Sequence, residues 1–223
     1  MRAATAITLA MSILIADVGH AAAAPAKQPT VSNWPAIIYF GDYKPVEPKT
    51  LDEIPGQIRR KLHAHLIDRL GEKYVARLTF AGGQIVDHDE LYRVDPSANY
   101  QWKVFAYSLI FRISAPEKGI TAYYARIELD KNGDVIRDIE LPPVRRLPIK
   151  QNFIPLSQAY ASASKHKFDR NSTRPEIVYD RDIESIVFQL NEVIGREPQI
   201  DRIIEIDAHS GRVLRIRKAH WSH

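Results

Sequence analysis

The chain has 223 residues, of which 45% are hydrophobic and 26% charged, so it can bury a core in one domain or two small ones and is not disordered. Its formal net charge of +4 is a mild basic excess without the clustering of a nucleic-acid-binding protein. It has no cysteine, which excludes disulfides, thiolate metal ligands and a cysteine nucleophile.

Residues 1–24 have the pattern of a secretory signal peptide. Arg2 supplies the positive start, residues 6–16 are apolar, and small residues follow from 19 to 24. The apolar run is about half of the roughly 20 residues that a membrane-spanning helix needs. A buried N-terminal helix is the alternative interpretation. No later stretch is apolar enough to span a bilayer, so we expect a soluble periplasmic or secreted protein.

Residues 25–50 are rich in proline. Within them only residues 36–40 can form a short strand, and we expect it at a sheet edge because prolines flank it. Residues 51–141 form a first predicted unit, which begins with a helix that ends at Gly71. One stripe of this helix is apolar, with the spacing of a buried face: Ile58, Leu62, Leu66 and Leu70.

Three strand-like stretches follow this helix, at residues 73–80, 84–87 and 102–113. The polar residues 87–100 separate the last two and are predicted to form a long loop. The unit then ends with a hairpin, residues 121–141, around an Asn-Gly turn. The first unit is therefore predicted to be a helix followed by an antiparallel sheet.

Residues 142–152 contain three prolines in seven positions and are predicted to be a linker. The second unit, residues 153–223, begins with an alanine-rich helix that extends to about His166. Strands are predicted at residues 176–179 and 184–192, before a final hairpin. The fold class is therefore α+β, with two helix-plus-antiparallel-sheet units in tandem or fused into one pseudosymmetric body.

The final hairpin echoes the first. It pairs residues 202–207 with residues 212–217 across a turn that ends in Gly211, since both stretches alternate apolar and polar residues. The residues expected on its buried face are Ile204, Ile206, Leu214 and Ile216. The reverse face, expected to lie in water, sets two acids opposite two bases: Glu205, Asp207, Arg215 and Arg217.

Three stretches of the second unit carry a family pattern: the helix 157–161, the strand 186–190 and the hairpin residues 204–214. With them, residues 153–217 resemble a PepSY domain, a module of secreted bacterial proteins and of some metallopeptidase propeptides. The first unit is a more distant echo. The resemblance implies a PepSY/cystatin-like fold in which a helix lies across an antiparallel sheet. It also implies an envelope location and a role in binding or restraining other proteins, and it supplies no catalytic motif.

Several polar groups have catalytic or metal-binding spacing, but a structural role is favoured for each. Ser162 and Lys165 have the spacing of penicillin-interacting acyl enzymes, whose companion motifs are missing. The Asp-His-Asp-Glu run at 87–90 is interpreted as turn residues that point in different directions. His63 and His65 lie two apart on a helix and do not share a face.

Two further groups lie in the linker and the C-terminal tail. His220 and His223 have the residue type for an adventitious metal, although a frayed tail is favoured. Arg145, Arg146 and Lys150 have the charge to contact anionic lipid or polymer, although a solvated linker is favoured. We therefore expect no catalytic residue, metal ion or cofactor, and the ligand-binding residues stay unknown.

The leading expectation is a non-enzymatic binding or regulatory module of the cell envelope. It would recognise another envelope protein, and not nucleic acid, through an exposed sheet edge or the groove between the units. One alternative is a small-ligand-binding protein or hydrolase with a pocket on the concave sheet face and residues 87–100 as a lid. Another is a structural spacer in an envelope complex. The oligomeric state is left open.

Overall fold

The computed structural model describes residues 30–33, 38, 40–98, 104–196 and 199–221. The predicted signal peptide, residues 1–24, and most of the predicted strand 36–40 lie outside the described residues. Within them, no helix has both the length and the apolar character needed to span a bilayer.

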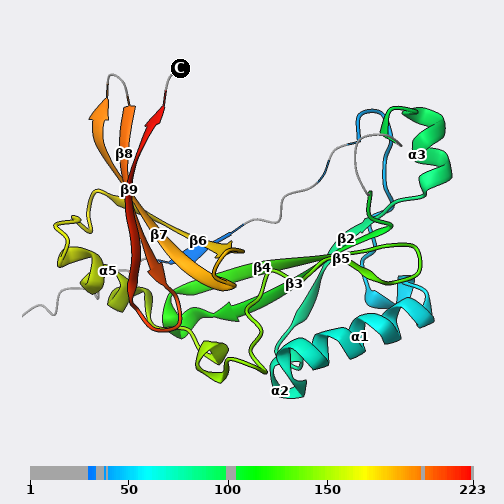
Figure 1. Ribbon diagram of the computed structural model, residues 1–223, viewed down its shortest axis with the longest axis horizontal. Coiled ribbons are helices and arrows are strands. Elements are labelled where there is room, and N and C mark those ends of the chain that lie inside the picture. Colours follow the sequence, from blue (N-terminus) through cyan, green and yellow to red (C-terminus); the bar gives the residue numbers. More distant parts are fainter. Residues whose placement is uncertain (1–29, 34–37, 39, 99–103, 197–198, 222–223) are drawn as a thin grey trace, which may run out of the picture.

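The fold is α+β, as the sequence predicts, with two sheets (Figure 1). The first sheet has the strand order β1-β4-β3-β2, with β5 also paired to β4; its strands are β1 (Val31–Ser32), β2 (Thr79–Ile85), β3 (Tyr107–Ala115), β4 (Ile120–Leu129) and β5 (Val135–Arg137). The second has the order β6-β7-β8-β9, from β6 (Thr173–Asp180), β7 (Ser185–Arg196), β8 (Gln199–Asp207) and β9 (Val213–Trp221). All pairs are antiparallel except β1 with β4.

Among the described residues, four α-helices and three short 3₁₀-helices accompany the sheets. They are η1 (Leu51–Glu53), α1 (Gly56–Leu70), α2 (Glu72–Val75), α3 (His88–Val94), η2 (Pro116–Lys118), η3 (Pro148–Gln151) and α5 (Leu156–Ser164). The four apolar residues predicted to form the inner face of α1 are all buried. Gly71 ends α1 at a φ of 81°, a left-handed value that glycine adopts without steric cost.

The two sheets share an order of elements. In each, four antiparallel strands follow a helix: α1 precedes β2 to β5, and α5 precedes β6 to β9. The last hairpin turn then lies against that helix. A Cβ atom on Gly133 would lie 3.1 Å from Ile58 of α1, and one on Gly211 would lie 3.1 Å from Gln158 of α5. Both glycines have positive φ, 82° and 76°.

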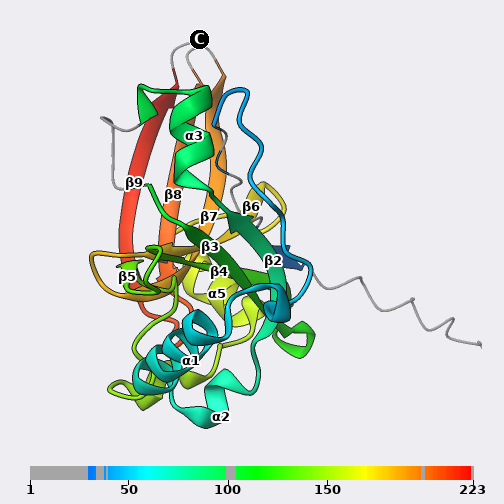
Figure 2. The same ribbon diagram turned by 90° about the vertical axis from the view of Figure 1, so that its right-hand side faces the viewer.

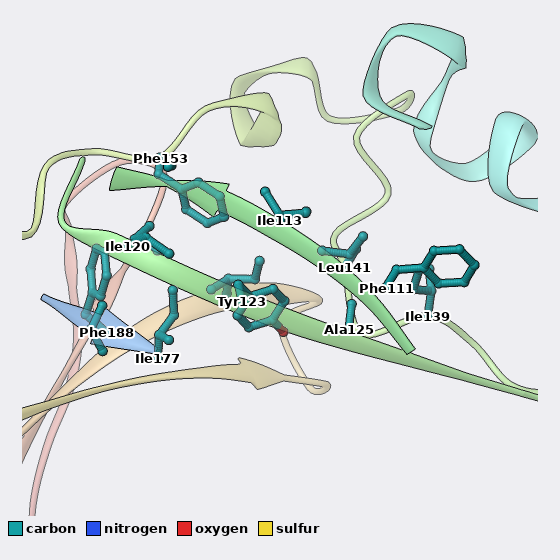
Figure 3. Packing of buried hydrophobic residues seen from close by; sticks show 14 of the residues in the cluster. Phe111, Ile113, Ile120, Tyr123, Ala125, Ile139, Leu141, Phe153, Ile177 and Phe188 are labelled. Carbon is teal, nitrogen blue, oxygen red and sulfur yellow. The ribbon is translucent and has the colours of Figure 1, made fainter. Parts of the chain in front are cut away.

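One hydrophobic core runs through both sheets (Figure 3). Ile120 and Tyr123 of β4 belong to the same buried cluster as Ile177 of β6 and Phe188 of β7. Phe153, at the start of the second predicted unit, packs in this cluster as well. The linker therefore does not separate two independent cores.

Away from this core the molecule has two projecting parts. The long strands β7 to β9 extend from one side of the core, and α3 lies on the other side (Figure 1). Both parts project toward the same end of the molecule (Figures 1 and 2). β9 forms the outer margin of the second sheet (Figure 2).

Residues 73–80 are not one strand. α2 occupies Glu72–Val75, and β2 begins only at Thr79 and continues through the glycine pair as a bulge at residues 80–82. The glycines allow close approach instead of ending the strand, because a Cβ atom on Gly83 would lie 2.2 Å from the Ser108 carbonyl oxygen.

Residues 87–100 are also more ordered than predicted, since they contain α3. The Asp87 side chain caps α3 by accepting hydrogen bonds from the backbone N–H groups of Asp89 and Glu90, at 3.0 and 3.2 Å. Leu91 on α3 is fully buried in a small second core, with Tyr43, Val86 and Phe105. This core was not predicted because its residues come from distant segments.

The final hairpin is confirmed, but its inward residues differ from the prediction. Ile204 and Ile206 are fully buried as expected. A bulge then sets Ile206 opposite Val213, so Val213 packs on the core in place of Leu214. Ile216 is 46% exposed, which contradicts its predicted burial.

Candidate functional site

The second sheet has one face packed on α5 and the core, and an outer face that carries polar side chains. We call outer face the surface formed by Asp180, Ser185, Gln189, Glu205, Asp207, Arg215 and Arg217. The sequence predicts that its hairpin part lies in water. In the structure, however, Glu205 is only 1% exposed. Two neighbouring pockets hollow this face, and their lining residues follow one another along β8 and β9.

The first pocket, which we call the charged pocket, has a volume of about 410 Å³ and is lined by residues of all four strands. Glu205 is its centre: Arg217 Nε donates to Glu205 Oε1 at 3.2 Å, and Gln189 Nε2 donates to the same oxygen at 3.1 Å. Arg215 pairs with Glu205 and with Asp180. The hydrogen bond to Glu205 raises the pKa of Arg215. The ions of this pocket therefore neutralise one another.

The second pocket, which we call the turn pocket, has a volume of about 380 Å³ and lies beside the turn between β8 and β9. Its walls are apolar and cationic, and its polar side chains come from the ends of β7 and β8. The lining residues are Ile149, Lys150, Ile183, Ser185, Asp207, His209, Ser210, Arg212 and Leu214. The linker, the β6–β7 turn and the final hairpin thus meet in one place.

Asp207 is the carboxylate of the turn pocket, and its hydrogen-bonding capacity is used within the protein. Ser185 Oγ donates to Oδ2 at 2.7 Å. Ser210 donates to Oδ1 through both its backbone N and its hydroxyl, at 2.7 and 2.8 Å, and His209 N donates at 3.1 Å. Desolvation by burial raises the pKa of Asp207, but these hydrogen bonds outweigh it, so the pKa is lowered. Asp207 is therefore an ionised residue that holds the turn.

His209 is neutral in this pocket. Its ring stacks on Phe153 at a centroid distance of 5.2 Å, and Nδ1 lies 3.0 Å from the carbonyl oxygen of Asn152. This contact assigns the proton to Nδ1, and Nε2 is buried with no hydrogen-bond partner among the described residues. Burial lowers the pKa of His209, against the opposing field of Asp207. The ring therefore adds no positive charge at neutral pH.

Two cations line the turn pocket. Lys150 Nζ donates to the carbonyl oxygens of Ile183 and Glu184, at 3.2 and 2.9 Å, which fixes its position and leaves one of its three N–H groups. Arg212 is exposed, and no described residue forms an ion pair or side-chain hydrogen bond with its guanidinium. These two cations outnumber the single carboxylate of the lining, Asp207, so the pocket favours an anion.

The residues with catalytic or metal-binding spacing are not brought together. Ser162 Oγ donates to the Gly211 carbonyl oxygen at 3.0 Å, which ties α5 to the hairpin turn, while Lys165 is exposed. His88 Nε2 lies 3.1 Å from the Phe105 carbonyl oxygen, next to the cap of α3. His65 contacts Asp138 at 2.8 Å, whereas His63 is exposed. Within the described residues, no group of three potential ligands is placed to hold a metal ion.

The other predicted groups have mixed outcomes. Arg145 and Arg146 are exposed, as a solvated linker predicts, although Arg145 also pairs with the exposed Asp68 at 2.9 Å. Lys150 differs, because it contacts the β6–β7 turn. His223 and the side chain of His220 lie outside the described residues.

Of the residues that line the turn pocket, the sequence singled out only Lys150 as a possible anion contact, and it did not predict a pocket. Its two isoleucines mark the pocket most clearly in the structure, because Ile149 and Ile183 are 74% and 43% exposed although both are large and aliphatic. In the sequence Ile149 lies between Pro148 and Lys150, and Ile183 lies between Asp182 and Glu184, without a period that assigns either to a core. A search for aliphatic residues without periodicity would have found them.

Comparisons with family models, with curated proteins and with solved structures find no match to this chain. The resemblance of residues 153–217 to a PepSY domain therefore stays a prediction.

Proposed function

We propose that this chain is an exported, non-enzymatic binding module of the cell envelope, built from two PepSY-like units at residues 51–141 and 153–223. It binds another envelope protein by accepting an extended segment of it as an added strand beside β9. Nucleic acid is not its partner. Export rests on the sequence pattern of residues 1–24.

The observation that carries this proposal is the open edge of β9. This strand has nine residues and pairs only with β8 among the described strands (Figure 2). An unpaired edge presents backbone N–H and C=O groups to any extended chain, which is the basis of β-strand addition. Four consecutive side chains on it are exposed, from Arg215 to Lys218.

The charge of this edge indicates the partner. Residues 212–218 contain four cations and no acid. Such a row disfavours pairing with a second copy of the same edge, because like charges would meet, and it favours an acidic segment. Glu205 and Asp180 hold Arg215 and Arg217 in place but leave Arg212 and Lys218 available.

The turns support two related units. Asp130 accepts hydrogen bonds from the backbone N–H groups of Asn132 and Asp134 at 2.8 and 2.9 Å, as Asp207 does from the residues of its own turn. In each turn a glycine with positive φ follows and faces the preceding helix. An aspartate, a glycine and a helix thus recur in the same arrangement.

One observation favours the alternative of a small-ligand-binding protein, namely the turn pocket. Its volume of about 380 Å³ falls within the range of roughly 300–1,000 Å³ typical of ligand sites. Under the leading proposal, the same pocket serves recognition of the protein partner.

Capture from periplasmic extract tests the proposal. Lys218→Glu reverses a charge on the β9 edge, and Lys131→Glu makes the same change on the first hairpin turn. We expect the wild-type chain and the Lys131→Glu variant to capture the same partner, and the Lys218→Glu variant to lose most of it. Added salt should weaken capture. Equal capture by both variants, or no reproducible partner, would contradict strand addition at β9.

A further inference from the structure

The turn pocket has apolar walls that no described element covers. Ile149 from the linker, Ile183 from the β6–β7 turn and Leu214 from β9 supply these walls. The exposed fractions of the first two, 74% and 43%, leave aliphatic surface in water. An occupant with an aliphatic group would remove this surface from water, at roughly 25 cal/mol per Å².

The charge of the pocket defines the other end of the occupant. Lys150 is held by two carbonyl groups, so its ammonium is already positioned, and the guanidinium of Arg212 forms no ion pair or hydrogen bond with a described residue. Asp207, the carboxylate in the lining, accepts four hydrogen bonds from the protein. His209 is neutral. Two cations therefore stand against one carboxylate, and an anionic group is attracted by Lys150 and Arg212.

The size and place of the pocket limit the occupant further. A volume of about 380 Å³ is near the lower end of ligand sites and suits one or two residues of a peptide. The pocket reaches the beginning of β9, at Leu214 and at Arg212, which immediately precedes the strand. A strand added antiparallel to β9 would bring its C-terminal end to this point.

We propose that the turn pocket binds the C-terminal carboxylate and the terminal aliphatic side chain of the partner segment. The carboxylate lies at Lys150 and Arg212, and the side chain packs on Ile149, Ile183 and Leu214. This inference rests on the proposed function, because it takes the added strand on β9 as the route by which the segment arrives.

The minimal probe is N-acetyl-L-leucine, which has the carboxylate and the aliphatic side chain alone. Its controls are N-acetyl-L-leucinamide, which lacks the charge, and acetate, which lacks the side chain. In an NMR titration of the full chain we expect N-acetyl-L-leucine to shift the backbone amides of Ser185 and Leu214. Both controls should bind at least tenfold more weakly. Equal binding of the amide or of acetate would overturn the proposal.

Variants locate the binding. Arg212→Gln should lower the affinity for N-acetyl-L-leucine about tenfold, and Ile149→Ser should lower it severalfold. Both residues are exposed, so the fold should remain intact. Arg174→Gln, an exposed arginine on β6, is the matched control and should have no effect. Unchanged binding by the Arg212→Gln variant would contradict the assignment.

A second probe separates this inference from the proposed function. An acidic peptide with a free C-terminal leucine should bind more tightly than N-acetyl-L-leucine, and only the peptide should be weakened by Lys218→Glu. If the peptide binds no better, the site takes a free small carboxylate and the proposed peptide end is wrong. If the partner is captured through β9 but neither probe binds, the function stands and this inference fails.

Discussion

Arg69 on α1 donates a hydrogen bond from Nη2 to the hydroxyl of Tyr179 on β6, at 3.3 Å. The same guanidinium reaches Asp138 at 2.9 Å, the Leu141 carbonyl oxygen at 3.0 Å and Glu184 at 3.3 Å. The Arg69 side chain is only 14% exposed. One cation thus ties the first helix to the second sheet at the margin of the shared core.

Arg69→Ala should destabilise the whole chain. Its partners in both halves would lose a largely buried cation. We expect the free energy of unfolding to fall by roughly 2–3 kcal/mol, since hydrogen bonds to charged groups contribute about 1.5–3 kcal/mol each and Asp138 and Glu184 are partly solvated. Urea unfolding measures this. Arg60→Ala, an exposed residue of the same helix, should change stability by less than about 0.5 kcal/mol. Similar midpoints for the two variants would refute the role of Arg69.

Alanine at the turn glycines should be costly in both hairpins. Gly133 and Gly211 have positive φ, which costs other residues about 1–2 kcal/mol. At Gly133 the added Cβ also crowds Ile58, which is buried and cannot move away, so Gly133→Ala should be the more destabilising. Gly41→Ala is the control: φ is 59° there and nothing lies within 4 Å of the added atom. Thermal unfolding should rank Gly41→Ala as the mildest of the three variants.

Tyr74→Phe should stabilise the protein. Burial raises the pKa of Tyr74 to about 12, and its hydroxyl has no hydrogen-bond partner among the described residues. Removing that hydroxyl should raise the free energy of unfolding by about 1 kcal/mol, because an unsatisfied buried polar group is lost. Tyr123 is the opposite case, since its hydroxyl donates to the Glu140 carbonyl oxygen at 2.8 Å. Tyr123→Phe should therefore lower the free energy of unfolding by a similar amount. The same sign for both variants in urea unfolding would be inconsistent with these contacts.

His209 should make the protein less stable in mild acid. Burial lowers its pKa in the folded chain below the usual 6.5, so the unfolded chain binds a proton more readily. Stability should therefore fall as the pH drops from about 6.5 towards the lowered folded pKa. His209→Gln should flatten this part of the stability–pH curve, with Asp207 and Lys150 still facing the site. An unchanged slope between pH 6.5 and 5 would contradict the prediction.

Asp207 should affect the stability of the protein at lower pH than His209 does. Its folded pKa is lowered from 3.8, so its contribution is present above that value and is lost as the pH falls through the folded pKa. Ser185→Ala removes one donor to this carboxylate and should reduce the acid-sensitive contribution. The comparison is best made between pH 4 and 2, where His209 is already protonated in the unfolded chain.

Local patterns in the sequence predicted the helices and strands whose conformation is set by the spacing of consecutive residues. The stripe from Ile58 to Leu70 follows helical spacing, and the face of Ile186, Phe188 and Leu190 on β7 follows the alternation of a strand. Gly211 marked the final turn because only glycine adopts its φ of 76° at little cost. The α+β class followed from these elements.

Other features depended on contacts between distant segments. The stretch at residues 73–80 has strand-like composition, yet its first residues form α2, where Tyr74 is buried. The bulge that exchanges Leu214 for Val213 is set by pairing with β8, which no property of β9 alone reveals. The burial of Glu205 likewise depends on Arg215 and Arg217 lying over it.

The sequence by itself determined the fold class, the helices with a clear apolar stripe and the two hairpins, because these follow from the periodicity and backbone preferences of consecutive residues. Only the tertiary structure decided that both sheets share one core and that Ile149, Ile183 and Arg212 line one pocket. The physical reason is that these arrangements depend on register, on a bulge and on long-range packing. Their energies come from residues far apart in the chain and leave no local pattern.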